Sequence, residues 1–174
     1  MMKEIALIGG SFNPPHIGHL MAALYVRATL GSDEVWLVPS YCHPFGKVLP
    51  PFDDRVAMCE AMASEVGPWL SVSQAESQVG GEGRTIELLE WLLPKHPGVR
   101  FRWIIGSDIL ADLPKWKAWD RIQQLVQVTV LHRNDGLGCA GSQVGVAGCG
   151  RRTTYVCVRS QNWVRDSEVL ADAP

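Results

Sequence analysis

Residues 5–20 read IALIGGSFNPPHIGHL and determine how the rest of the chain folds. An apolar run ends in two glycines, and two prolines and two histidines follow, an order that predicts a buried strand, a sharp turn and a helix start. Gly9 and Gly10 let the backbone turn and approach a ligand closely. Pro14 or Pro15 suits the first helical position, where a missing N–H costs nothing. We therefore expect the N-terminus of this helix to point at a ligand.

Two histidines stand on the first turn of that helix. His16 and His19 lie about one turn apart on the same face. The helix dipole and the unpaired N–H groups attract a phosphate there, and Gly18 adds no side chain to block it. Two imidazoles can donate hydrogen bonds to charge that grows during phosphoryl transfer.

A structural alternative stays open, in which His16 caps the helix and His19 is half-buried. Zinc ligation is a further alternative, but no carboxylate or third histidine follows nearby, so we expect no metal site.

Composition restricts the classes of partner. The 174 residues include 16 basic and 18 acidic ones, mixed along the chain, and 47% are hydrophobic. A net charge of −2 gives no reason to expect a nucleic acid or a membrane as partner. The apolar N-terminal stretch is interrupted at Gly9, which fits neither a signal peptide nor a membrane span, so we expect a cytoplasmic protein. Five cysteines without a Cys-x-x-Cys pair indicate reduced thiols.

Strand-like and helix-like segments alternate along the chain. Short connections between them predict a parallel sheet, and we expect one domain, 1–174, with an α/β doubly wound, Rossmann-like fold and helices on both faces. Gly31 is expected to end the first helix. The expected strands are 3–8, 34–39, 69–76, 99–105, 127–132 and 153–158, and the expected helices are 15–31, 52–65, 85–93, one beginning at Ile109, and 119–126.

Three of these strands end in polar or glycine-rich segments. They are GGSFNPPHIGH after the first strand, GSD at 106–108 and HRND at 132–135. Ligands of such sheets bind at the carboxyl ends of the strands, so we expect the three segments to meet in space. The chain has neither the G-x-x-x-x-G-K-[ST] of a P-loop nor the G-x-G-x-x-G of a dinucleotide fold.

The stretch at 9–20 resembles the signature of the nucleotidyltransferase superfamily with the H-x-G-H motif. Its GGSFNPP version is similar to that of bacterial nicotinate-nucleotide adenylyltransferases. The resemblance runs from about residue 3 to residue 133. Three further segments carry it in order: VPSYCHPFGK at 38–47, RTIELLEWL at 84–92 and IIGSDILADLPKW at 104–116.

The resemblance implies that nicotinate mononucleotide attacks the α-phosphorus of ATP. The products would be nicotinate adenine dinucleotide and pyrophosphate, as in NAD biosynthesis, with no covalent enzyme intermediate. Magnesium, Mg2+, would bridge the triphosphate oxygens of the co-substrate ATP. ATP and nicotinate mononucleotide are then the expected small-molecule partners.

The resemblance also implies roles for individual residues. Backbone groups at Thr85 would receive the nicotinate carboxylate and favour it over the amide. The implied catalytic residues are His16, His19 and Lys47; the ATP-binding residues are Gly9, Gly10, Ser11, Phe12, Gly18, Gly106, Asp108, Arg133, Ser160 and Arg165; and Asn13, Thr85 and Trp116 would bind the nicotinate nucleotide.

Each of several side chains also fits a purely structural role. Lys47 fits a solvated loop lysine, Asp108 fits a helix cap and Trp116 fits a core residue. Arg133 fits a partner of Asp135. These alternatives stay open from the sequence.

The chain departs from the family pattern at several positions. Arg84 stands where a tyrosine is usual and Leu88 where a threonine is usual. The glycine-rich segment 134–152 reads as a loop or insertion. The segment 153–174 reads as an atypical, truncated C-terminal segment, such as a shifted reading frame would give.

A serine and an arginine remain of the family's last motif. It is matched in RSQNWVR only by Ser160 and Arg165, which also fit an N-cap and a surface charge.

Two other functions stay open. One is a related nucleotidyltransferase with another phosphorylated acceptor, such as phosphopantetheine. The other is a homologue that binds nucleotides without turnover. The sequence leaves the oligomeric state open, a homo-oligomer included.

Overall fold

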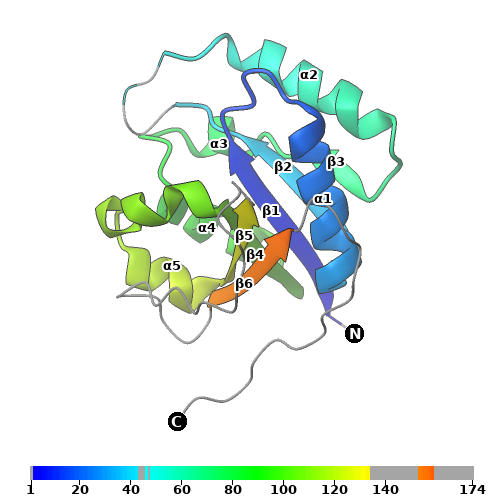
Figure 1. Ribbon diagram of the computed structural model, residues 1–174. Coiled ribbons are helices and arrows are strands. Elements are labelled where there is room, and N and C mark those ends of the chain that lie inside the picture. Colours follow the sequence, from blue (N-terminus) through cyan, green and yellow to red (C-terminus); the bar gives the residue numbers. More distant parts are fainter. Residues whose placement is uncertain (1, 43–45, 47, 134–152, 159–174) are drawn as a thin grey trace.

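A six-stranded parallel sheet forms the centre of the molecule (Figure 1). The computed structural model describes residues 2–42, 46, 48–133 and 153–158. The strand order is β3-β2-β1-β4-β5-β6, and every neighbouring pair is parallel. The strands are β1 (Lys3–Gly10), β2 (Glu34–Pro39), β3 (Leu70–Val72), β4 (Val99–Gly106), β5 (Gln127–Arg133) and β6 (Thr153–Val158).

Helices cover both faces of the sheet, which confirms the predicted α/β fold with its doubly wound order. Helices α1 and α2 lie on one face, and α3, α4 and α5 lie on the other (Figure 1). No helix in the described part of the chain is both long enough and apolar enough to cross a membrane. The helices are α1 (Ile17–Leu30), α2 (Phe52–Ser64), α3 (Ala75–Val79), α4 (Thr85–Leu92) and α5 (Trp119–Leu125), with the 3-10 helices η1 (Leu93–Lys95) and η2 (Ser107–Lys115).

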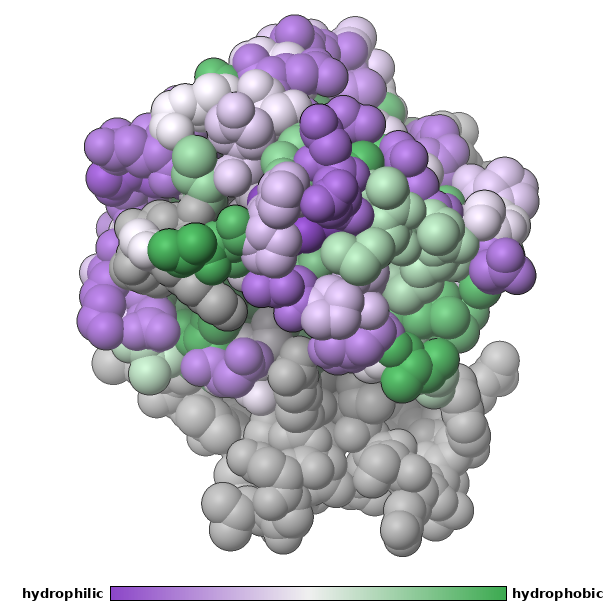
Figure 2. Space-filling view, turned by 90° about the horizontal axis from the view of Figure 1, so that it is seen from above, coloured by the Kyte–Doolittle hydropathy of each residue, from purple (hydrophilic) through white to green (hydrophobic). Residues whose placement is uncertain are grey.

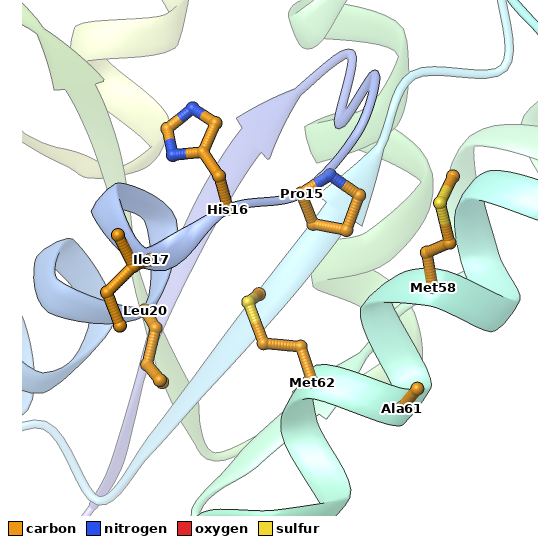
Figure 3. A pocket seen from close by; sticks show the side chains of 7 residues that line it. All are labelled: Pro15, His16, Ile17, Leu20, Met58, Ala61 and Met62. Atoms are coloured by element: carbon orange, nitrogen blue, oxygen red, sulfur yellow. The ribbon is translucent and has the colours of Figure 1, made fainter.

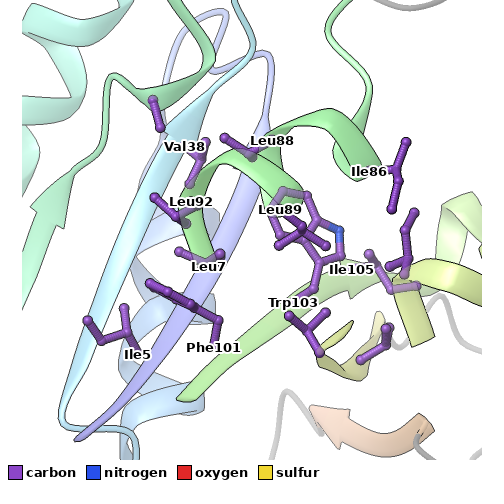
Figure 4. Packing of buried hydrophobic residues seen from close by; sticks show 14 of the residues in the cluster. Ile5, Leu7, Val38, Ile86, Leu88, Leu89, Leu92, Phe101, Trp103 and Ile105 are labelled. Carbon is purple, nitrogen blue, oxygen red and sulfur yellow. The ribbon is translucent and has the colours of Figure 1, made fainter. Parts of the chain in front are cut away.

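The alternation of side chains along the strands divides the core into two clusters. Ile5 and Leu7 of β1 face α4, whereas Ala6 and Ile8 face α1 and α2. Figure 4 shows the first cluster, in which leucines of α4 lie over Leu7 and over the aromatic rings of β4. Because the central strands are buried on both faces, their sequences are almost continuously apolar.

The strand order places the candidate site. β1 pairs with β2 on one side and with β4 on the other. The chain leaves β1 toward α1 on one face and leaves β4 toward η2 and α5 on the opposite face. The carboxyl ends of β1 and β4 therefore border the crevice in which ligands of this architecture bind.

The start of α1 differs from the expectation. Neither Pro14 nor Pro15 occupies the first helical position, because the helix begins at Ile17 with His16 as its N-cap. The capping groups are the two histidine side chains. The end is as predicted: Gly31 is the C-cap and adopts a left-handed conformation with φ 68°.

Two further elements differ from the sequence prediction. The strand expected at 69–76 ends at Val72, and α3 follows, because the Ser73 hydroxyl accepts a hydrogen bond from the Ala75 N–H at 3.4 Å and turns the chain. The helix expected from Ile109 is η2, which contains Pro114. Proline cannot donate a backbone hydrogen bond, so a regular α-helix is not continued there.

Gly31 provides a test of how α1 ends. Replacing it with alanine adds no clash, since nothing lies within 4 Å of a Cβ built there. The left-handed backbone alone should lower the free energy of unfolding, by about 1–2 kcal/mol. Urea denaturation measures this loss. Gly31→Asn is the matched control and should lose less, because asparagine tolerates this conformation. Equal losses of unfolding free energy in the two variants would contradict the left-handed backbone of Gly31 as the cause.

Candidate active site

Two imidazoles cap the N-terminus of α1. The His16 Nδ1 accepts a hydrogen bond from the Gly18 N–H at 3.1 Å. In return, the His16 N–H donates to the His19 Nδ1 at 3.1 Å. The pair forms a capping box of the kind usually made by a hydroxyl and a glutamate. The capping role considered for His16 is therefore present in the structure.

These hydrogen bonds fix which ring nitrogens are donors. Because each Nδ1 is an acceptor, the proton of each neutral ring is on Nε2. The ring centroids of His16 and His19 lie 3.9 Å apart, with 39° between the ring planes. The first turn of α1 thus holds two N–H donors side by side at the positive end of the helix dipole. This arrangement suits an anionic oxygen.

The glycines of the motif make room for aromatic rings. A Cβ on Gly18 would lie 2.9 Å from the His16 Cε1, so the imidazole can fold back over the helix only above a glycine. A Cβ on Gly9 would lie 2.7 Å from Cζ2 of Trp103, and one on Gly10 would lie 3.3 Å from the ring of Phe12. A Cβ would therefore clash at Gly9 and at Gly18, whereas at Gly10 the Phe12 ring would have to move slightly.

Phe12 anchors the turn between β1 and α1. Its ring is buried and lies 4.8 Å from the ring of His19, centroid to centroid. Its backbone has φ 45°, a left-handed conformation that is uncommon for a residue with a side chain and is found mostly where the surroundings enforce it. Because the ring is in the core, only the backbone of Phe12 is available to a ligand.

The end of β4 brings Gly106 and Asp108 to the same edge of the sheet as the histidines. Asp108 is exposed, and its carboxylate lies where a Cβ on Gly106 would be. The capping role considered for Asp108 is wrong: η2 has Gly106 as its N-cap and no side-chain capping bond, so Asp108 stands inside the first turn. Its exposed carboxylate is available to a ligand.

Thr85 and Trp116 lie on the α4 face. Thr85 is the first residue of α4, and the Arg84 side chain makes no capping bond there but pairs with Glu82. Trp116 follows η2, is half-buried, and packs edge-to-face on Trp119 with 5.9 Å between ring centroids. The core role and the ligand role of Trp116 are therefore compatible, because one part of its surface is buried and another is exposed.

The remaining predicted residues are placed only in part. Asn13 and Ser11 stand in the turn before α1, Asn13 exposed and Ser11 half-buried. Arg133 is the last residue of β5 and pairs with Val158 of β6. Lys47, Ser160 and Arg165 lie outside the described residues, as do the segments 134–152 and 159–174.

Figure 2 looks down on this end of the molecule, onto the carboxyl ends of the strands. Hydrophilic residues occupy the middle of the face, and hydrophobic residues gather beside them. An apolar groove of about 410 Å³ runs between α1 and α2 and reaches His16 and Pro15 (Figure 3). The His16 ring points away from Met58 and Met62 of this groove (Figure 3), so its Nε2 donor does not face the methionines.

Comparison with known proteins identifies the family. Residues 7–167 match the family model described as Cytidylyltransferase-like. A protein of Myxococcus xanthus (strain DK1622) named probable nicotinate-nucleotide adenylyltransferase is 56% identical over 130 residues, which are 75% of this chain and 68% of the relative. The chain belongs to the nicotinate-nucleotide adenylyltransferase family. This confirms the resemblance seen in the sequence.

A further relative and a solved structure are also similar to this chain of the nicotinate-nucleotide adenylyltransferase family. A relative of the same name from Anaeromyxobacter dehalogenans (strain 2CP-C) is 49% identical over 134 residues, 75% of this chain and 71% of its own length. A structure of Plasmodium falciparum nicotinic acid mononucleotide adenylyltransferase complexed with NaAD superposes with a TM-score of 0.74 at 18% identity, covering 92% of this chain and 77% of the other. At that identity the likeness concerns the fold.

The buried residues Arg55, Glu76 and Trp103 of this adenylyltransferase-family chain border the site region and were not predicted from the sequence. The Trp103 Nε1 has no hydrogen-bond partner among the described residues, and its ring lies against Gly9. Arg55 falls on the same helical stripe as Val56, Cys59 and Ala63, and a charge on an apolar stripe is the signal that was available. The burial of Glu76 could not be predicted in this way, because α3 is only five residues long and shows no apolar stripe.

Glu76 is a buried carboxyl beside the loop that follows β2. Burial raises its pKa to about 7, the Tyr41 backbone N–H donates to the carboxylate and lowers it, and the charge of Glu87 raises it. The folded state therefore binds this proton more tightly than the unfolded chain does, where the pKa is near the ordinary 4.5. Consequently, this group stabilises the fold fully below pH 4.5, and its contribution is lost as the pH rises to about 7.

Replacing Glu76 with glutamine should remove this pH dependence, because an amide oxygen still accepts from the Tyr41 N–H but does not ionise. Urea denaturation should show that wild type loses stability between pH 5 and pH 8, by on the order of 2–3 kcal/mol, and that Glu76→Gln loses much less. Glu60→Gln, at an exposed position of α2, is the control and should keep the wild-type slope. The same slope in all three proteins would contradict the burial argument.

Proposed function

We propose that this chain transfers the adenylyl group of ATP to nicotinate mononucleotide, giving nicotinate adenine dinucleotide and pyrophosphate in NAD biosynthesis. The observation that carries the proposal is the pair of imidazoles at the N-terminus of α1, each bound to the backbone through Nδ1. The names of relatives at up to 56% identity support this acceptor.

The reaction is a direct displacement. A phosphate oxygen of nicotinate mononucleotide attacks the α-phosphorus of ATP, and the bond from that phosphorus to the oxygen of the β-phosphate breaks. Pyrophosphate leaves with the electron pair of that bond. The chain forms no covalent bond, so positioning and stabilisation of charge carry the catalysis. His16 and His19 donate from Nε2 to the phosphate oxygens as negative charge grows on them.

Magnesium enters with ATP as part of the substrate. No group of three or more His, Cys, Asp or Glu side chains in the described part of the chain is arranged to hold a metal ion. Triphosphate oxygens are strong magnesium ligands in their own right, and magnesium retains several of its waters. We therefore assign magnesium to the MgATP complex, with the imidazoles as protein donors to the same phosphates.

The two ends of the site take different parts of the substrates. Gly9, Gly10 and Gly18 would admit the triphosphate, Asp108 would accept from ribose or adenine, and Trp116 would stack on the pyridine ring. The uncapped N–H groups at Thr85 would donate to the nicotinate carboxylate. Backbone of Ser11 and Phe12 and the residues Gly106, Asn13, Lys47, Arg133, Ser160 and Arg165 complete the proposed set. The cytoplasmic location is a prediction from the sequence.

Pyrophosphate release tests the reaction. The purified protein with MgATP should release pyrophosphate with nicotinate mononucleotide and much less with nicotinamide mononucleotide or 4′-phosphopantetheine. Turnover only with 4′-phosphopantetheine would replace the proposed acceptor. If a folded protein binds ATP and turns over none of the three, the chain is a nucleotide-binding homologue and the proposal is wrong.

Replacing His19 with glutamine separates catalysis from capping. Glutamine at this position of a helix can accept from the His16 N–H, so the capping box and the fold should be kept. Loss of one imidazole donor should lower kcat by about 10²–10³-fold, as for other donors to a developing oxyanion. Steady-state pyrophosphate release measures the change, and thermal unfolding checks the fold. His96→Gln, which lies beside Trp36 and Phe101, is the control and should keep turnover. Near-normal turnover of His19→Gln would remove His19 from the mechanism.

A further inference from the structure

Arg55 is a buried cation next to the turn that follows β1. It stands in the first turns of α2, and only 1% of its surface is exposed. Long charged side chains are rarely buried unless they are paired. Burial lowers the pKa of the guanidinium, but arginine stays protonated in proteins. A full positive charge therefore lies inside the molecule at this point.

The partners of Arg55 are backbone carbonyls and a ring. Its Nη1 donates to the Ser11 carbonyl at 2.9 Å, and its Nε donates to the Pro50 carbonyl at 3.0 Å. The guanidinium carbon lies 5.6 Å from the ring centroid of Phe52. These contacts join the turn after β1 to the end of the loop between β2 and α2.

A second buried arginine is paired differently. Arg102 of β4 contacts the Glu4 carboxylate at 3.0 Å and the Thr129 hydroxyl at 3.3 Å. No ion pair joins Arg55 to a carboxylate within the described ranges. Polar carbonyls stabilise the Arg55 guanidinium without neutralising it. The positive charge of Arg55 is therefore available to an anion bound nearby.

The hydrogen bond to Ser11 also orients the backbone. In a trans peptide the C=O and the following N–H point in opposite directions. The Ser11 carbonyl is held from the side of α2, so the Phe12 N–H leaves the turn on the opposite side. The Gly10 carbonyl is likewise held from β2, by the Ser40 N–H at 2.9 Å, which turns the Ser11 N–H away from β2. The Ser11 N–H is thus directed away from β2, and the Phe12 N–H is directed away from α2.

The conformation of Phe12 supports this orientation. Its φ of 45° is a left-handed backbone conformation, which persists when the surroundings of the residue hold it in place. Arg55 holds the carbonyl on one side of Phe12, and the core holds the ring. Successive N–H groups beside a left-handed residue form concave sites that bind anions.

We propose that Arg55 is a positioning residue for the triphosphate: its bond to the Ser11 carbonyl directs the Ser11 and Phe12 N–H groups at the phosphates, and its buried charge attracts them. The inference rests on the proposed use of ATP at this end of the site. It adds a residue from α2, outside the glycine and histidine motif, to the groups that determine where the phosphates lie. Arg55 acts through the backbone and does not touch the reacting atoms.

Kinetics of Arg55→Met and Arg55→Lys test the proposal, with Arg102→Met as the matched buried control. Arg55→Met should lower kcat/KM for ATP by about a hundredfold, the scale expected when reacting groups are displaced by about an ångström. The KM for nicotinate mononucleotide should not change, and lysine, which keeps the charge and one donor, should restore part of the loss. Arg102→Met should lower the melting temperature without changing kcat/KM. If Arg55→Met keeps the kcat/KM of Arg102→Met, Arg55 is structural only and the proposal is wrong.

A second measurement does not depend on the acceptor or on the folding of Arg55→Met. Tripolyphosphate is added to the ¹⁵N-labelled wild type and to Arg55→Lys, and amide chemical shifts are followed. The Ser11 and Phe12 amides of wild type should shift strongly, and Arg55→Lys should bind tripolyphosphate more weakly. Unshifted Ser11 and Phe12 amides in wild type would overturn the proposal. Failure with nicotinate mononucleotide would instead overturn only the proposed acceptor, because tripolyphosphate binding is measured without it.

Discussion

The parallel pairing of β1 with both β2 and β4 is the constraint on which the rest of the molecule depends. A central strand that is buried on both faces must be apolar. The connection that follows β1 lies on one face of the sheet, and the connection that follows the neighbouring strand β4 lies on the opposite face. The carboxyl end of β1 then lies in a crevice, with backbone that no neighbouring strand continues to pair. The turn, the glycines and the helix start that follow β1 are all located in this crevice.

The same few residues at this end stabilise the fold and prepare the chemistry. Histidine is an uncommon N-cap, since serine, threonine, aspartate and asparagine are strongly preferred at this position. Here the capping bonds of His16 and His19 also fix the protonated nitrogen of each ring. With imidazoles as caps, the Nε2 donors are oriented before any ligand binds.

Much of the fold could be predicted from the sequence because the central strands are short apolar runs between glycines and polar turns. β2 at Glu34–Pro39 coincides with its predicted range, and Gly31 ends α1 as predicted. The prediction that Pro14 or Pro15 begins α1 was wrong, because proline marks a helix start only approximately. Side-chain capping by the histidines places the start at Ile17. β3 is short since Ser73 turns the chain, a local competition that periodicity does not record.

The candidate site was predictable where a motif carried it and not where tertiary contacts did. His16, His19 and Gly106 follow directly from strand ends, and the structure brings them to one edge of the sheet. The roles of Arg55 and Glu76 depend on carbonyl and N–H groups far away in the sequence, at Ser11 and Tyr41. Such contacts exist only after the helices pack.

The contact between Trp103 and Gly9 limits how this sequence can change over evolutionary time. The indole fills the space in which any side chain at position 9 would begin. Because close-packed interiors do not absorb an extra methyl without displacement, the two positions can change only in one order. Position 103 has to become smaller before position 9 can become larger, so a single-step exchange at the glycine is closed to this chain while the tryptophan remains.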